Sequence, residues 1–214
     1  LELQPQQIIA LRTDAELDDY TYRVAGCVGE FWTKICRAHL FPTARLDDAR
    51  VLADSVRFGK GLQLVNILRD LPADLRKGRC YLPADELAAA GLQPTDLLSL
   101  ANELKFRPLY NRYLDLAESN LAAGWQYTNL IPFNHWRVRL ACAWPILIGV
   151  KTIARLRVAN VLDPQQRVKV SRAEVRGLIS RSVLCYPFPG VWQRLMALPA
   201  PASGNAVASN SNLA

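Results

Sequence analysis

Carboxylate and amide side chains recur at helical spacing in one segment of the sequence. Gln63, Asn66, Asp70 and Asp74 are separated by three, four and four residues, so in a helix of about 3.6 residues per turn they share one face. Two carboxylates four residues apart, with an amide one turn earlier, suit Mg²⁺, which takes oxygen ligands and commonly shares them with substrate phosphates. Such an ion neutralises charge on a departing diphosphate. Basic side chains that could bind the same anion are Arg69, Arg76, Lys77 and Arg79.

A solvated helix end is the alternative interpretation of these acidic residues. Asp70 and Asp74 could simply pair with nearby Arg and Lys side chains, as acidic residues four apart often do. Two features oppose this interpretation. Acidic side chains near a helix C-terminus are disfavoured by the helix dipole, and the polar stripe continues inward through Gln63 and Asn66, which a solvated face does not require. The residues alone leave both interpretations open.

Glycines in a predicted helix indicate a second functional element. Gly26 and Gly29 stand in the middle of a helical pattern, where each is less favourable than Ala by roughly 0.5–1 kcal/mol. We therefore expect a close approach to this backbone, either by another helix or by an apolar ligand chain in a groove. Gly59 and Gly61 add small residues to the next helix, on the surface expected to face it.

Helices are the elements that must position these groups. Apolar residues recur at three, four and seven positions, and no alternating strand pattern with hairpin turns is present. Helices are expected at about residues 14–40, 47–71, 84–90, 106–126, 135–160 and 171–184.

Local signals define the ends of these helices. Capping-box patterns stand at Thr13 with Glu16 and at Ser171 with Glu174. Pro72 is expected to end the second helix and to begin a basic loop that extends to residue 83. The remaining signals are Pro42 as a stop, Gly91 as a C-cap, Asn134 as an N-cap and Pro145 as a kink.

Composition narrows the class of protein. The chain has 214 residues, 50% of them apolar and 21% charged, which describes a water-soluble globular domain or a large piece of one. The net charge of +7 favours anionic partners, but the arginines are spread along the chain, so nucleic acid is not expected. Five separated cysteines without a C-x-x-C pair favour buried free thiols in a reducing compartment and no zinc site. The longest uncharged apolar window, residues 140–150, is too short for a membrane span, and the first residues lack the features of a signal peptide.

Three motifs carry a resemblance to a known family. They read Tyr20-x-x-x-Val24-Ala25-Gly26-x-Val28-Gly29, Gln63-x-x-Asn66-Ile67-x-Arg69-Asp70-x-x-x-Asp74 and Gly78-Arg79-x-Tyr81-Leu82-Pro83. This combination resembles the squalene/phytoene synthase family of head-to-head prenyltransferases. The resemblance implies an all-α class I isoprenoid synthase bundle, whose central cavity holds prenyl chains.

The resemblance also implies roles for individual residues. Those implied in catalysis are Tyr20, Asp70 and Asp74; the last two, with Asn66, are also the implied Mg²⁺ ligands. Those implied in substrate binding are Val24, Gly26, Val28, Gln63, Asn66, Arg69 and Arg79. Lys169 and Arg172 are implied to bind NADPH, because Val168-Lys169-Val170 resembles a segment of squalene synthases.

Within the family, Cys142-Ala143-Trp144-Pro145 favours a squalene synthase. The implied reaction joins two farnesyl diphosphates into presqualene diphosphate, releases diphosphate and reduces the intermediate with NADPH to squalene. A phytoene or dehydrosqualene synthase is the alternative, as is a non-catalytic binding module on the same scaffold. Arg139 and Ala141 stand where squalene synthases carry phenylalanine, which is a departure from the squalene synthase pattern.

The first Asp-rich motif of the family has no match before Asp70, where Asp18-Asp19 and Asp47-Asp48 are adjacent pairs in another context. We therefore expect an N-terminally truncated chain that lacks the first helices of the bundle. Residues 1–198 are expected to form the C-terminal portion of one domain, and residues 199–214 a disordered tail. A cytoplasmic monomer is expected, with peripheral contact at the inner face of the membrane left open.

Overall fold

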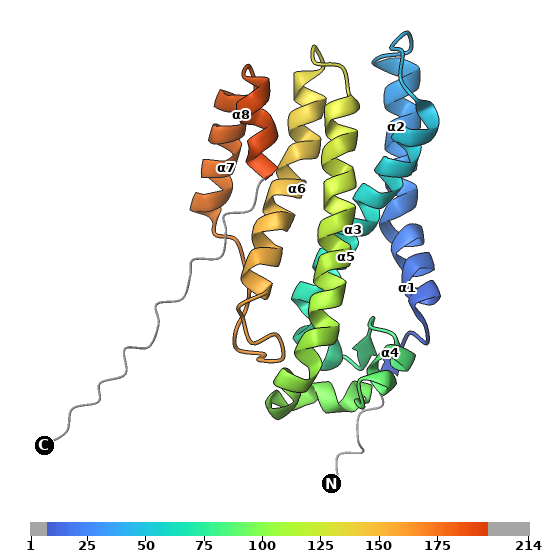
Figure 1. The fold of residues 1–214 in the computed structure, drawn as a ribbon, viewed down its shortest axis with the longest axis vertical. Helices are drawn as coiled ribbons and strands as arrows, with labels where there is room; N and C mark the ends of the chain where they lie inside the picture. Colours follow the sequence, from blue (N-terminus) through green and yellow to red (C-terminus); the bar gives the residue numbers. More distant parts are fainter. Residues whose placement is uncertain (1–7, 197–214) are drawn as a thin grey trace, which may run out of the picture.

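The computed structural model describes residues 8–196, which form a bundle of helices (Figure 1). The predicted all-α class is confirmed. The expected tail, residues 199–214, lies outside the described residues. The α-helices are α1 (Asp14–Thr21), α2 (Cys27–His39), α3 (Asp48–Leu75), α4 (Ala84–Ala89), α5 (Glu103–Leu130), α6 (Trp136–Leu156), α7 (Arg172–Cys185) and α8 (Pro189–Gln193). Shorter elements are a π-helical turn η1 (Tyr22–Gly26), 3₁₀ turns η2 (Pro94–Leu98), η3 (Leu100–Asn102) and η4 (Arg194–Met196), and strands β1 (Ile9–Ala10) and β2 (Arg79–Cys80).

Helix α3 runs through the middle of the bundle. Figure 1 shows α5 in front of it, α1 and α2 along one side, α6 along the other, and α7 with α8 beyond α6. Helix α4 and the neighbouring turns lie across one end. The core consists mainly of apolar side chains from α3, α5 and α6, and its largest fully buried members are Tyr110, Tyr113, Tyr127 and Phe106. Because buried side chains of α3 pack on both α5 and α6, α3 is a rigid support for the polar stripe of Gln63, Asn66, Asp70 and Asp74.

The predicted helix at residues 14–40 forms, but it contains a π-helical turn. Helices α1 and α2 are joined without a break by η1. The capping box at its start is half formed: the Thr13 hydroxyl accepts the Glu16 N–H at 3.3 Å, while the Glu16 carboxylate accepts the Arg12 N–H at 2.7 Å. The π-helical turn begins two residues after Tyr20, and such turns occur frequently at functional sites.

Close packing of α3 on α2 and on η1 explains two of the glycines. A Cβ on Gly29 would lie 2.1 Å from the Ser55 carbonyl oxygen, and a Cβ on Gly59 would lie 2.2 Å from the Ala25 carbonyl oxygen. No side chain fits at such distances, so these positions need glycine for the two backbones to meet. The expectation of a close helix approach is confirmed.

The prediction that Pro72 ends the second helix was wrong, because α3 continues to Leu75. Proline lacks the N–H that would bond to the Leu68 carbonyl four residues earlier. The buried Tyr110 hydroxyl of α5 donates to that carbonyl instead, at 3.0 Å. Leu71 and Leu75 are both buried and hold the last turn against the core. The expected basic loop therefore begins after Leu75, and Asp74 lies on the helix.

Two other expectations were corrected. Asn134 does not cap α6; His135 occupies the N-cap position without a side-chain hydrogen bond, and the preceding turn is closed by its N–H bonding to the Pro132 carbonyl. A strand pair also forms, although no strand pattern was found. β1 pairs with β2 in parallel, with Ile9 opposite Arg79, and this pairing fixes the chain after α3 beside the start of α1.

Local signals were correct elsewhere. The capping box of Ser171 and Glu174 is complete at the start of α7, and Gly91 takes a positive φ of 69° after α4. The thiols are free; Cys36, Cys80 and Cys142 are buried, as expected for small apolar residues, whereas Cys27 and Cys185 are partly exposed.

Candidate active site

The predicted polar stripe lies on one face of α3. Because the helix extends through Pro72, Gln63, Asn66, Asp70 and Asp74 are all in regular helical register. Asn66 is exposed, and the other three are partly buried. The inner side of the same helix is apolar and packs into the core, so the stripe faces outward between the elements that flank α3.

Asp74 has an environment suited to a cation. Burial raises its pKa above the usual value, and the negative charge of Asp70 adds to this effect. Lys77, whose Nζ lies 3.8 Å from Asp74, and Arg79 lower the pKa in part. Arg79 therefore lies close enough to act on Asp74, although its side chain is exposed. A divalent cation would relieve both the burial and the repulsion.

Asp70 is paired with its neighbour. Its two oxygens accept hydrogen bonds from Arg69 Nε at 2.9 Å and Nη2 at 2.6 Å. The hydrogen bond to Asp70 raises the pKa of Arg69. Both side chains stay partly exposed, at 46% for Asp70 and 36% for Arg69, so the pair can open to a ligand. If Asp70 bound a cation, Arg69 would be free to donate to an anion.

The donor set fits Mg²⁺ of the kind that shares its ligands with a substrate. Within residues 8–196, no group of three or more His, Cys, Asp or Glu side chains is placed to hold a metal ion. The groups available are two carboxylates, from Asp70 and Asp74, and the exposed amide of Asn66, all on one face of α3. Mg²⁺ is commonly bound by one or two carboxylates together with substrate phosphates and water.

A polar cavity of about 360 Å³ opens beside Asp70. It is lined by Arg69, Asp70, Ile148, Thr152, Arg167, Val168, Lys169 and Val170. Three cationic side chains and one carboxylate thus meet at the boundary of α3, α6 and the segment before α7. The cavity brings Lys169, for which the resemblance implied a role in binding NADPH, beside Asp70. Arg172, the other predicted cofactor residue, is exposed at the first position of α7 and does not line this cavity.

Tyr20 lies on the other side of the stripe. Its ring stacks on Tyr81 with centroids 4.9 Å apart. Its hydroxyl is hydrogen-bonded with Tyr81 and with Gln63, and burial, followed by the bond to Tyr81, raises its pKa to about 12. Asp74 adds to this shift. Tyr20 is therefore a protonated hydroxyl beside the Gln63 end of the predicted stripe.

Tyr81 was absent from the predicted site residues. The parallel strand pair places it against Tyr20, because β2 ends one residue before it. Its presence in the Gly78-Arg79-x-Tyr81 motif was the available signal.

An apolar cavity of about 420 Å³ follows the polar one along the same two helices. It is lined by Val24, Ala25, Val28, Gly29, Trp32, Ser55, Phe58, Gly59, Leu62, Tyr127, Ala141, Cys142 and Pro145. On α6, Pro145 lines the apolar cavity and Ile148 lines the polar one, less than one helical turn away. The predicted residues Val24 and Val28 line the cavity and are 45% and 56% exposed.

Gly26 does not line this cavity. It is buried, and a Cβ there would lie 3.0 Å from the Tyr22 ring and 3.3 Å from a Val56 methyl group. Its role is packing between η1 and α3. The sequence gives no sign that the aromatic residues Trp32, Phe58 and Tyr127 line this cavity, since no local pattern shows that three separate helices converge on one space.

Comparisons with known proteins find relatives of this chain. A family model described as squalene/phytoene synthase matches residues 3–174. The phytoene synthase of Thermus thermophilus is 40% identical over 182 residues, which cover 85% of this chain and 58% of the relative. Phytoene synthase 2 of Solanum lycopersicum is 42% identical over 184 residues, covering 86% of this chain and 55% of the relative. The chain thus spans somewhat more than half the length of these relatives.

A solved structure shares the fold. The complex of TcSQS with the ligand BPH1237 superimposes with a TM-score of 0.69 at 18% identity, covering 91% of this chain and 58% of the other. At this identity the likeness supports the helical architecture.

Proposed function

Because the chain belongs to the squalene/phytoene synthase family, we propose that it carries the diphosphate-binding face of a Mg²⁺-dependent head-to-head prenyltransferase. One observation carries the proposal: a polar cavity with Asp70, Arg69 and Lys169 adjoins an apolar cavity along α3 and α6. A prenyl diphosphate has the same division into a charged head and an apolar chain. The substrates are thus two prenyl diphosphates, with farnesyl diphosphate as the first candidate.

The side chains of the polar cavity bind the diphosphate. Asp70 and Asp74 would hold Mg²⁺, with Asn66 beside them; the ion supplies neutralisation of the charge that develops on the leaving diphosphate. Arg69 and Lys169 donate charge-assisted hydrogen bonds to the anion, the arginine as a two-pronged donor. The basic Arg79 adds positive charge at the Asp74 end.

The remaining groups orient the substrate and exclude water. Tyr20, whose pKa is raised to about 12, stays protonated and can donate its hydrogen to a phosphate oxygen or a departing group. The apolar cavity surrounds the prenyl chain with Val24, Val28 and aromatic rings. Such a lining keeps water from a reactive carbocation.

Squalene is the first candidate product, on the strength of the Cys142-Ala143-Trp144-Pro145 motif, whose Cys142 and Pro145 line the apolar cavity. The predicted NADPH residues do not fit one site, because Lys169 lines the polar cavity and Arg172 does not. We therefore derive no reduction step. Phytoene is the second candidate, favoured by relatives that are 40% and 42% identical and are named phytoene synthases.

The cellular location of the protein and its monomeric state remain predictions. Among the described helices, none has both the length and the apolar character needed to cross a bilayer. We propose a cytoplasmic chain, with peripheral contact at the inner face of the membrane as the accompanying proposal for release of a hydrocarbon product.

Product analysis tests the proposal. The chain, and its complete reading frame where that is longer, is incubated with Mg²⁺ and either farnesyl or geranylgeranyl diphosphate, with and without NADPH. Squalene formed only with NADPH supports the first candidate, and phytoene from geranylgeranyl diphosphate supports the second. Absence of any condensation product from the complete reading frame, together with no Mg²⁺-dependent diphosphate binding by the chain, would refute the proposed function.

A further inference from the structure

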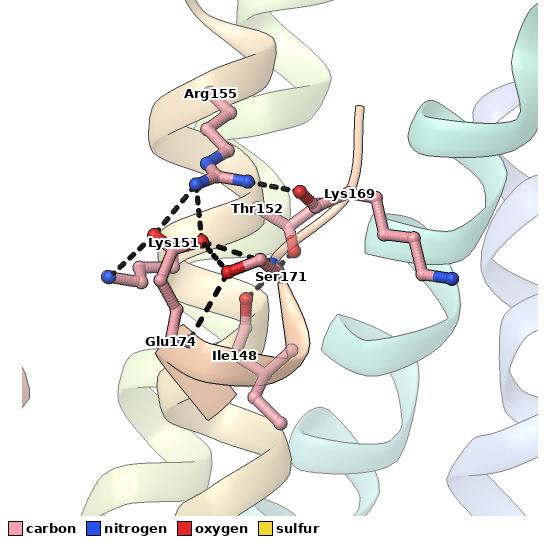
Figure 2. A network of polar contacts seen from close by, with 7 residues as sticks. All are labelled: Ile148, Lys151, Thr152, Arg155, Lys169, Ser171 and Glu174. Carbon is pink, nitrogen blue, oxygen red and sulfur yellow. Dashed lines mark hydrogen bonds and ion pairs between the residues drawn. The ribbon is translucent and has the colours of Figure 1, made fainter. Parts of the chain in front are cut away.

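Glu174 joins three parts of the structure around the polar cavity (Figure 2). Its Oε2 accepts the Ser171 N–H at 3.0 Å and the Ser171 hydroxyl at 2.8 Å. Its Oε1 accepts Lys151 Nζ at 3.0 Å, and Arg155 Nη2 lies 2.7 Å from both oxygens. One carboxylate thus binds the start of α7 to two basic residues of α6.

Arg155 extends this connection to Lys169. While Nη2 of Arg155 is held by Glu174, its Nη1 donates to the Lys169 main-chain carbonyl. The guanidinium has a fixed planar fork, so anchoring one side sets the direction of the other. Glu174 therefore fixes the Lys169 backbone without touching the Lys169 side chain.

The Lys169 side chain leaves this network on the opposite side. Figure 2 shows it extending away from Arg155 and Glu174 toward the neighbouring helix α3, and it lines the polar cavity with Arg69 and Asp70. Ile148 and Thr152 of α6 line the same cavity, whereas Lys151 and Arg155 of α6 bind Glu174. The same stretch of α6 thus lines the polar cavity and also binds Glu174.

We propose that Glu174 is a positioning residue: through Arg155 it holds the Lys169 main chain in place, so that the Lys169 ammonium faces the anion bound at Asp70. This inference rests on the proposed function only for the identity of the anion. Glu174 stays ionised throughout the physiological range, because the Ser171 donors, followed by Lys151 and Arg155, lower its pKa to about 2. Lys151 and Arg155 are occupied by Glu174, which leaves Lys169, Arg167 and Arg69 as the cations on the cavity.

Two measurements on the full chain test the proposal. Hydrogen–deuterium exchange of residues 166–171 reports the position of the segment, and calorimetric titration with inorganic diphosphate in the presence of Mg²⁺ reports the anion site. Glu174→Gln removes the ion pairs with little change in shape. Arg155→Lys keeps the positive charge but lacks the fork that reaches the Lys169 carbonyl.

Both variants are expected to speed exchange in residues 166–171 and to weaken diphosphate binding by roughly three- to tenfold. Lys169→Met is expected to weaken binding roughly tenfold or more, because it removes a charge-assisted hydrogen bond. The double variant Lys169→Met/Glu174→Gln should bind no more weakly than Lys169→Met alone, since Glu174 acts through Lys169.

The change in net charge distinguishes a positioning role of Glu174 from a direct electrostatic effect of its charge on anion binding. Glu174→Gln makes the chain more positive, which by itself would strengthen anion binding. Glu118→Gln is the matched control, because Glu118 also accepts from an arginine of the α6 C-terminus, Arg157, at 2.6 Å, but it does not line the polar cavity. It should leave exchange and affinity at wild-type values or bind slightly more tightly.

The outcomes are distinct for the two proposals. Unchanged exchange in residues 166–171 of Glu174→Gln would overturn the positioning role, whatever the affinity. Multiplying effects of Glu174→Gln and Lys169→Met would overturn it as well. If the wild-type chain does not bind diphosphate with Mg²⁺, that result counts against the proposed function, which product analysis of the complete reading frame then decides, while the exchange measurement still decides whether Glu174 holds the segment.

Discussion

The two cavities that follow one another along α3 and α6 are built in different ways. The apolar cavity takes its shape from backbones: α3 meets α2 at Gly29 and η1 at Gly59, where a Cβ would come within about 2.2 Å of a carbonyl oxygen. The polar cavity is made by long side chains that pair with one another, such as Arg69 with Asp70. Packing therefore determines the shape of the apolar cavity, where we propose that the prenyl chain binds, and exchangeable ion pairs line the polar cavity, where we propose that the diphosphate binds. Each can be altered without the other.

The largest expected effect comes from Asp70→Asn. The change removes a metal-binding charge while keeping size and polarity, so Mg²⁺-dependent turnover should fall at least roughly a hundredfold, since a bound metal ion contributes several kcal/mol of charge stabilisation. Asp70 is half exposed, so its ion pair with Arg69 adds little stability. The melting temperature should stay close to that of the wild type. Turnover and diphosphate titration with Mg²⁺ measure the effect.

Asp115→Asn is the matched control for this variant. Asp115 is 68% exposed and also pairs with an arginine, Arg157, at 2.6 Å, but it lies outside the polar cavity. It should retain wild-type turnover and diphosphate affinity. Unchanged turnover in Asp70→Asn would exclude the metal-binding role of this carboxylate.

The second effect is confined to the apolar cavity. Ala141 of α6 lines it and is exposed, so Ala141→Phe can place a ring in the cavity without disturbing the core. If the ring displaces about two methylene groups of a prenyl chain, each contributing about 0.8 kcal/mol, farnesyl diphosphate should bind roughly tenfold more weakly. Inorganic diphosphate should bind as before. Ala173→Phe, on the exposed start of α7, provides the control; weakening of inorganic diphosphate by Ala141→Phe would contradict the separation of the two cavities.

The sequence predicted the features that depend on neighbours in the chain. The stripe from Gln63 to Asp74 follows from helical spacing alone, and the complete capping box at Ser171 follows from two side chains three residues apart. The continuation of α3 through Pro72 could not be predicted, because the hydroxyl that satisfies Leu68 comes from Tyr110, 42 residues away.

The residues of the candidate site divide in the same way, into those with a local signal in the sequence and those that depend on distant parts of the chain. Asp70 and Asp74 were found by spacing, and Lys169 by resemblance. Tyr81 depends on a parallel pair of two-residue strands, which leaves almost no pattern in the sequence. Phe58 and Tyr127 reach the apolar cavity from different helices, and only the packing of α3 on α5 brings them together.

The third expected effect concerns Tyr20, where one substitution removes the hydroxyl and keeps the ring. Tyr20→Phe keeps the stack on Tyr81 but removes the hydroxyl bonded with Gln63 and Tyr81. The lost hydrogen bonding should reduce turnover by about fivefold, in line with about 1 kcal/mol for a neutral hydrogen bond. The pKa is raised to about 12, so the wild-type hydroxyl is protonated at neutral pH and its loss should change turnover equally at pH 7 and pH 9. A loss of turnover that grows toward pH 9 would instead indicate an ionising Tyr20.

The smallest effect, and the one that best separates stability from binding, is expected at Asp74. Burial raises the pKa of this carboxyl above 3.8, so the folded chain takes up the Asp74 proton more readily than the unfolded chain does. The resulting stability is fully present below pH 3.8 and is lost as the pH rises through the higher pKa of the folded state. At neutral pH the ionised Asp74 therefore destabilises the fold, and Asp74→Asn, which removes the charge, should melt at a slightly higher temperature than the wild type. This difference should vanish below pH 3.8, where both side chains are neutral.

Mg²⁺ with diphosphate should reverse the order of the two melting temperatures. Ligands that bind the folded state stabilise it, and the variant has lost the carboxylate charge that would bind Mg²⁺. Thermal melts at pH 3.5 and pH 7, with and without Mg²⁺ and diphosphate, measure all four combinations. An Asp74→Asn chain that gains as much from the ligands as the wild type would show that the polar cavity binds its anion without Asp74.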